Sequence, residues 1–212
     1  MALNTLPWSR NEIIHLSEAG NTAIVSGDGN VVSLSELKSS ARNPPVTIQE
    51  TSSGVFRLQN EQLEVTVERG CVTSLYDQQA RREIIPRGAK ANNFVIFDDK
   101  PVYWQAWDVE VYHLETRQEL PGAISTIFEN GPHRASVVTD IKINENSSIR
   151  SIISLSAVAP GQQSYVECSA DVQWHESMKF LKVEFPVDIR NTEASYETQY
   201  GIVKRPTHYN TS

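Results

Sequence analysis

The chain has 212 residues, enough to bury a substantial hydrophobic core in one or two domains. Lys and Arg total 19 against 26 Asp and Glu, and the two signs are interspersed along the chain. Because phosphate binding needs a clustered basic surface, this balance argues against nucleic acid as a partner. No apolar run approaches the roughly 18 residues that a membrane span needs, and residues 1–10 lack the pattern of a secretory signal.

Two β-rich regions are expected in chain order, and they meet between residues 41 and 53. Arg42-Asn43-Pro44-Pro45 interrupts the strand pattern there, and Ser52-Ser53-Gly54 follows a short strand at 46–49. We therefore expect a small β-sandwich domain over residues 1–53, followed by part of a larger β domain over residues 54–212.

Several later segments alternate apolar and polar residues in the manner of half-buried antiparallel strands. They cover residues 63–68, 137–143, 149–158, 166–174 and 181–187, and the last is expected to point Leu181, Val183, Phe185 and Val187 inward. Asn130-Gly131-Pro132 and Pro160-Gly161 are turn signals between strands. No segment carries a 3.6-residue apolar stripe over three turns, so we predict an all-β sandwich with almost no helix.

The segment 101–110 has an unusual density of tryptophan, tyrosine and acid. Aromatic faces stack on the apolar faces of sugar rings, and carboxylates accept hydrogen bonds from hydroxyls, so this segment could form a ligand surface. Alternatively, Trp104 and Trp107 could be core aromatics, with Asp108 and Glu110 solvated on an alternating strand. The residue pattern favours the core interpretation and leaves both open.

Other candidates for chemistry are weaker. Asp98-Asp99-Lys100 could supply carboxylates for acid and base catalysis, but a solvated turn is the favoured interpretation. The five histidines show no HxH or HxxxH spacing, so no metal site is predicted in the chain. Cys71 and Cys168 belong to no metal-binding spacing and are expected to be buried free thiols. No motif for a nucleophilic serine or for nucleotide phosphates occurs.

Five groups of segments occur in a recognisable order: residues 4–10 (NTLPWSR), 58–61 (LQNE) with 72–77 (VTSLYD), 104–108 (WQAWD), 174–186, and 205–212 (RPTHYNTS). Together they resemble the β region that follows the catalytic domain in family 38 glycoside hydrolases, the α-mannosidases. The resemblance is to the cytosolic and vacuolar type and extends over essentially the whole chain.

The resemblance implies a retaining, zinc-dependent (or cobalt-dependent) hydrolase of terminal α-D-mannosyl residues. In that family a preceding α/β domain carries the metal ligands and the nucleophile, so no catalytic residue and no cofactor are expected in this chain. The chain resembles the small β domain and the first part of a galactose-mutarotase-like supersandwich, truncated inside a motif. The implied partners are the missing catalytic domain, mannosides or oligomannose glycans, and further copies in a homo-oligomer, in the cytoplasm or vacuole.

The resemblance also selects Trp104, Trp107, Asp108, Arg205 and His208 as residues that could reach toward the substrate cleft. Two positions depart from the family pattern: Gln105 stands where an aspartate is usual, and Met178 where a histidine is common. A free-standing carbohydrate-binding or oligomerisation β module remains the alternative function.

Overall fold

The computed structural model describes residues 44–105, 107, 109–120, 122, 124–158 and 161–208, together with the backbone of four strands nearer the N-terminus. These strands form two antiparallel pairs: β1 (Ala2–Leu3) with β4 (Val31–Val32), and β2 (Arg10–His15) with β3 (Thr22–Gly27). Elsewhere in the described residues the strands are antiparallel too, and the only helix is the 3₁₀ helix η1 (Val111–Thr116). The predicted all-β class is confirmed.

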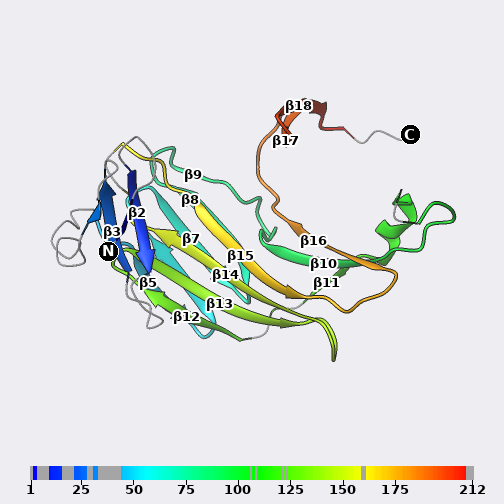
Figure 1. Ribbon diagram of the computed structural model, residues 1–212, viewed down its shortest axis with the longest axis horizontal. Helices are drawn as coiled ribbons and strands as arrows, with labels where there is room; N and C mark the ends of the chain where they lie inside the picture. The colour runs from blue at the N-terminus through cyan, green and yellow to red at the C-terminus, as the bar shows by residue number, and fades with distance from the viewer. Residues whose placement is uncertain are drawn as a thin grey trace.

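Two antiparallel sheets packed face to face form the body of the molecule (Figure 1). The first has the order β5 (Thr47–Ser52), β6 (Val55–Gln59), β7 (Leu63–Glu68), β8 (Cys71–Asp77), β9 (Arg82–Glu83). The second has the order β12 (Ser125–Asn130), β13 (Arg134–Lys142), β14 (Ser148–Ser156), β15 (Val166–Gln173). Every strand therefore neighbours the strand next to it in the sequence, as expected for successive hairpins.

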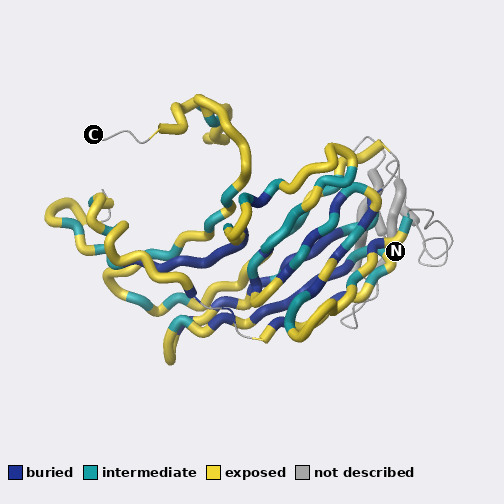
Figure 2. The backbone as a smooth tube through the Cα atoms, turned by 180° about the vertical axis from the view of Figure 1, so that it is seen from behind, coloured by how far each residue is buried: buried dark blue, intermediate teal, exposed yellow. Residues whose placement is uncertain are grey.

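The alternating side chains of these two sheets meet in one core. Figure 2 colours the backbone of buried residues dark blue, and both sheets carry such residues. Leu58 and Val65 from the first sheet are fully buried, as is Leu155 from the second. Each such side chain contributes about 1.5–3 kcal/mol by leaving water. The alternation predicted over residues 63–68 is confirmed, because Leu63, Val65 and Val67 all point into this core.

The predicted domain boundary at residue 53 falls within a hairpin of the first sheet. β5 pairs with β6 from Thr47 opposite Gln59 to Ser52 opposite Val55. Val46, just before β5, is buried in the same core and donates its N–H to the Pro132 carbonyl at 2.9 Å. Strand β5 is thus part of the sheet formed by later residues, and the division of the chain into two domains stays a prediction.

A third sheet extends from one end of the sandwich and consists of β11 (Gln118–Glu119), β10 (Asn93–Asp98) and β16 (Lys179–Glu184). Phe94 and Ile96 of β10 pack with Ile141 and Ile149 of the second sheet in a smaller cluster. The last hairpin, β17 (Glu193–Thr198) with β18 (Gly201–Pro206), stands away from this body (Figure 1). Within the described residues no helix is long and apolar enough to cross a membrane.

The prediction that residues 183–187 point inward is wrong for this structure. Val183 is 43% exposed, Phe185 50% and Val187 46%. The reason is that the alternation of a strand indicates which side chains share a face, whereas burial requires a second layer on that face. Within the described residues only Leu181 of this strand contacts the smaller cluster.

Asn60 joins the two main sheets through a buried set of hydrogen bonds. Its side-chain amide donates to the Ser156 carbonyl at 2.8 Å and to Ser164 Oγ at 2.7 Å, both near the second sheet. Its Oδ1 accepts from the backbone N–H groups of Gln62 and Leu63, each at 2.9 Å. Because a buried amide must be satisfied on both its donor and its acceptor side, these bonds determine how the β6–β7 turn sits on the opposite sheet.

Glu129 of β12 and Arg134 of β13 form an ion pair with little exposure, at 3.2 Å between Nε and Oε2. The Glu129 side chain is 3% exposed and the Arg134 side chain 17%. Ser136 donates its hydroxyl to the same carboxylate, while Arg134 reaches Glu167 of β15 at 3.3 Å and donates to Ser154 Oγ at 3.0 Å. Buried charges cost several kcal/mol unless paired in this way.

Replacing Arg134 by Met should lower the free energy of unfolding by about 3–5 kcal/mol, because it leaves the Glu129 carboxylate buried without its cation. The control is Arg150→Met, since Arg150 pairs with Asp140 at the surface and its loss should cost no more than about 1 kcal/mol. Urea denaturation measures both. The double variant Glu129→Gln with Arg134→Met should recover much of the stability lost in Arg134→Met. Equal losses in Arg134→Met and Arg150→Met would contradict the role of Arg134 as the partner of a buried carboxylate.

Candidate functional site

The five residues selected from the sequence lie in two separate parts of the fold. Trp104 and Trp107 are in the loop between β10 and η1, which we call the aromatic loop (residues 99–110). Arg205 is on β18 and His208 follows it, and both are exposed. Asp108 lies outside the described residues. Figure 1 shows the β17–β18 hairpin apart from the aromatic loop, so the structure does not bring the candidates together in one site.

The aromatic loop presents large apolar side chains to solvent. Tyr103 is 74% exposed, Trp104 77% and Trp107 86%. The interpretation of Trp104 and Trp107 as core aromatics is therefore wrong, and the alternative of a surface for ligands is the one compatible with their exposure. A group of exposed aromatic side chains on one loop marks a recognition surface more often than a lone exposed residue does.

Trp104 has a backbone conformation that bulky residues rarely adopt. Its φ is 60°, in the left-handed region. Its carbonyl accepts the Trp107 N–H at 2.9 Å, which closes a turn and places the two tryptophans at either end of it. A non-glycine residue in this region costs roughly 1–2 kcal/mol, and such strain concentrates at functional sites. Because the Trp104 side chain is exposed, it gains no burial energy that could offset this strain.

The start of the aromatic loop is held by a cluster of charges around Asp98, the last residue of β10. Lys100 approaches its carboxylate at 2.8 Å and Lys179 of β16 at 2.6 Å. Hydrogen bonds from Lys100 and then Lys179 lower the pKa of Asp98 from 3.8 to about 2. The Asp99 N–H donates to the Met178 carbonyl at 2.8 Å, and Met178 itself adopts a left-handed φ of 55°. The predicted solvated turn at 98–100 is thus a charged anchor.

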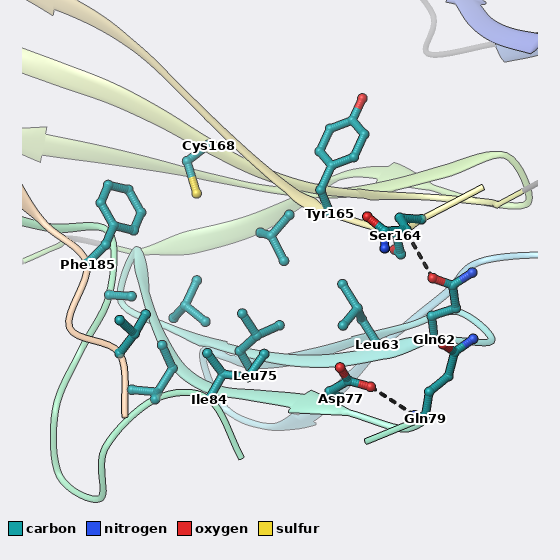
Figure 3. A pocket seen from close by; sticks show the side chains of 16 residues that line it. Gln62, Leu63, Leu75, Asp77, Gln79, Ile84, Ser164, Tyr165, Cys168 and Phe185 are labelled. Atoms are coloured by element: carbon teal, nitrogen blue, oxygen red, sulfur yellow. Dashed lines mark hydrogen bonds between the residues drawn. The ribbon is translucent and has the colours of Figure 1, made fainter. Parts of the chain in front are cut away.

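A groove of about 490 Å³ runs between the two main sheets at the edge nearest the C-terminal hairpin. Figure 3 shows Leu75 and Ile84 on one side and Cys168 and Phe185 on the other, with Gln62 and Ser164 at one end. Burial raises the pKa of the Cys168 thiol to about 11, so it remains protonated near neutral pH. The sequence offered no signal for this groove, because its walls come from strands about a hundred residues apart.

Neither cysteine forms a disulfide, as predicted, although both are only partly buried. Burial is also the main cause that raises the pKa of Cys71. Among the described residues, no three His, Cys, Asp or Glu side chains lie close enough to hold a metal ion.

If the left-handed backbone at Trp104 is strained, glycine should relieve it. We expect Trp104→Gly to be more stable than Trp104→Ala by about 1 kcal/mol, because only the alanine retains a Cβ in this region. Tyr103, an exposed aromatic residue of the same loop whose φ is not positive, is the matched control, and there Gly should be no better than Ala. Urea denaturation of the four variants measures this, and a Trp104→Gly variant less stable than Trp104→Ala would contradict it.

The Asp98 anchor should make stability depend on acid pH. The carboxylate has a lower pKa in the folded chain than its ordinary 3.8, so its contribution is present above that value and lost as the pH falls toward about 2. Asp98→Asn should remove this part of the dependence, and Lys179→Met should reduce it. Unfolding free energies measured across this pH window check the prediction. Identical profiles for wild type and Asp98→Asn would overturn it.

Comparison with known proteins places these features in a family. Residues 58–212 match the model of the glycosyl hydrolases family 38 C-terminal domain. Alpha-mannosidase 2C1 of Mus musculus is 39% identical over the whole of this chain, which covers 21% of that protein. An alpha-mannosidase of Saccharomyces cerevisiae is 42% identical over 73% of this chain and 15% of its own length.

Alpha-mannosidase G of Dictyostelium discoideum is 32% identical over 76% of this chain and 15% of its own length. The chain therefore spans about a fifth or less of each of these relatives. The family expected from the five ordered motifs is confirmed by comparisons that cover most or all of the chain. The chain belongs to glycosyl hydrolase family 38, the α-mannosidases, and most of it matches the C-terminal domain of that family.

Proposed function

We propose that this chain is a non-catalytic β region of a retaining α-mannosidase, which frames the substrate cleft of an enzyme whose catalytic residues lie on another domain. The observation that supports this most is the turn from Trp104 to Trp107, in which two exposed indoles are held on a strained backbone. It lies in one of the segments that carry the family resemblance. A group of exposed aromatic side chains on a strained turn is typical of a recognition surface.

The chemistry of the candidate residues suits a mannoside. The indole faces of Trp104 and Trp107 can stack on the apolar face of a pyranose ring, which contributes affinity without requiring charge. Asp108 can accept hydrogen bonds from sugar hydroxyls, and the guanidinium of Arg205 can donate them. His208 can do either. In this proposal the turn from Trp104 to Trp107 binds and orients the sugar and excludes water, and Arg205 and His208 face the cleft from a separate part of the fold. Proton transfer and nucleophilic attack belong to the missing domain.

The zinc or cobalt implied by the family resemblance does not fit the described residues. No group of three potential ligands occurs among them, so they are given no part in metal chemistry. The ion and the carboxylates of a retaining mechanism would have to come from the preceding catalytic domain. The remaining expectations also stand as proposals: oligomannose glycans as substrates, a homo-oligomeric enzyme, and a location in the cytoplasm or vacuole.

A chimera tests this proposal. The matching stretch of mouse alpha-mannosidase 2C1 is replaced by this chain, which aligns with it over its full length. The chimera should hydrolyse an aryl α-mannoside, and the 212-residue chain alone should not, with or without added zinc or cobalt. Trp104→Ala and Trp107→Ala in the chimera should each lower kcat/KM by about tenfold, which corresponds to the loss of roughly one stacking contact.

Phe128→Ala is the matched control for these variants. Phe128 is an aromatic residue of β12 that is 51% exposed, away from the aromatic loop. Its loss should leave kcat/KM unchanged. Full activity in the Trp104→Ala and Trp107→Ala chimeras would contradict the proposed cleft, and metal-dependent turnover by the chain alone would contradict its non-catalytic role.

A free-standing carbohydrate-binding or oligomerisation module is the second candidate, favoured by the same exposure of the aromatic loop. It differs in expecting affinity without a catalytic domain. Titration of the isolated chain with methyl α-mannoside, followed by the NMR signals of the indole N–H groups, separates the two. Saturable binding in the millimolar range or tighter favours the module, and no shift favours the enzyme region.

A further inference from the structure

His113 of η1 lies against the aromatic rings at the base of the aromatic loop. Phe97 of β10 and Phe180 of β16 are directly opposite each other in the sheet, and their rings stack with centroids 5.0 Å apart and 12° between planes. The imidazole sits 5.1 Å from each of these rings, edge-on to Phe97 and tilted against Phe180. The helix that ends the loop is thereby packed on two strands of the third sheet.

Both ring nitrogens of His113 have a partner. Nδ1 is 2.7 Å from the Glu110 carbonyl oxygen, and Nε2 is 3.3 Å from the Lys182 ammonium nitrogen. A carbonyl oxygen can only accept a hydrogen bond, so Nδ1 must carry the proton. An ammonium group can only donate, so Nε2 must be the acceptor. These two partners together are compatible with a single form of the ring, the neutral imidazole with its proton on Nδ1.

The Lys182 ammonium is itself held by the two phenylalanines. Its nitrogen lies 5.0 Å from the centroid of the Phe97 ring and 5.0 Å from that of Phe180. Cation–π attraction therefore keeps the ammonium beside the imidazole even though the lysine is exposed. The position of the cation and the position of the imidazole lone pair depend on the same ring pair.

The same helix is tied to the end of β10. Thr116 donates its hydroxyl to the His113 carbonyl at 2.8 Å, and its Oγ1 accepts the Asp98 N–H at 2.9 Å. With the bond from Asp99 to Met178, both ends of the loop are anchored on the third sheet. Between these anchors, the exposed indoles of Trp104 and Trp107 stand on a loop whose base is ordered. Such ordering before binding lowers the entropy cost of holding a ligand.

We infer that His113, kept as the neutral Nδ1–H tautomer between the Glu110 carbonyl and the Lys182 ammonium, is a positioning residue for the aromatic loop. It touches no substrate atom itself and acts through the orientation of Trp104 and Trp107. The claim that this orientation serves sugar binding rests on the proposed function, whereas the tautomer and the anchoring do not. The Glu110 carbonyl requires the proton on Nδ1, and Lys182 is the partner that keeps Nε2 as an acceptor.

The tautomer can be read directly by two-bond ¹H–¹⁵N correlation spectra of the labelled 212-residue chain near neutral pH. The signals of His113 are assigned by their absence in His113→Asn. Wild type should give the pattern of the neutral Nδ1–H ring, and Lys182→Met should convert it to a mixture of forms. Lys182→Arg, which keeps a donor, should restore the wild-type pattern. An Nε2–H ring or an imidazolium in wild type would overturn the inference.

Loop ordering is measured separately by amide hydrogen exchange of residues 109–116 and by acrylamide quenching of the tryptophans. His113→Phe, which keeps an aromatic ring but has no polar nitrogen, and Lys182→Met should each speed exchange in this segment by about tenfold. Lys142→Met is the control, because it removes an exposed lysine at the end of β13, in the second sheet, that pairs with Glu145 in the following turn. Exchange rates unchanged from wild type in both test variants would overturn the positioning role.

These outcomes are distinguishable from failure of the proposed function. A chimeric enzyme indifferent to Trp104→Ala would remove the role in mannoside binding and leave the tautomer and exchange results intact. If the function is correct, His113→Phe in the chimera should raise KM several-fold with little change in kcat, because a mobile loop weakens binding and leaves the catalytic groups in place. A loss confined to kcat would count against positioning.

Discussion

The packing of the five-stranded sheet on the four-stranded sheet is the constraint on which the rest of the structure depends. Leu58, Val65 and Leu155 lie together in a fully buried layer. Asn60, which is also buried, links the two sheets through hydrogen bonds of its side-chain amide. Burial of apolar side chains holds the two sheets together, but because it is not directional it does not select how they are aligned. The Asn60 hydrogen bonds are directional, so they limit the alignments that remain.

From that sandwich the third sheet is carried outward, and with it the aromatic loop. Just before β10, Ala91 pairs with Val72 of β8, and β10 itself packs on Ile141 and Ile149 of the second sheet. The end of β10 that leads into the aromatic loop therefore has a defined position relative to the core. The loop then combines an anchored base with an exposed tip. Because both ends of the loop are anchored on the third sheet, the large indoles remain exposed and the loop does not fold back onto the sheet.

The motifs that carry the family resemblance serve different physical purposes in the structure. Asn60 and Val72 are buried and belong to the framework. Glu176, in a third motif, accepts hydrogen bonds from Ser147 and Asn144 and so joins the segment between β15 and β16 to the β13–β14 turn. Trp104 and Trp107 instead face solvent. The motifs that identify the family therefore include some that maintain the fold and one whose tryptophans face solvent.

The sequence by itself determined the all-β class and the alternating strands, because side chains repeat every second residue and that period is local. It indicated the family separately, through the ordered motifs that resemble family 38. It could not decide whether Trp104 was core or surface, nor that Val183, Phe185 and Val187 would be exposed. Burial depends on what lies opposite a strand, which the local pattern does not contain. The His113 contacts and the groove beside Cys168 likewise join residues tens of positions apart, so only the tertiary structure could bring them together.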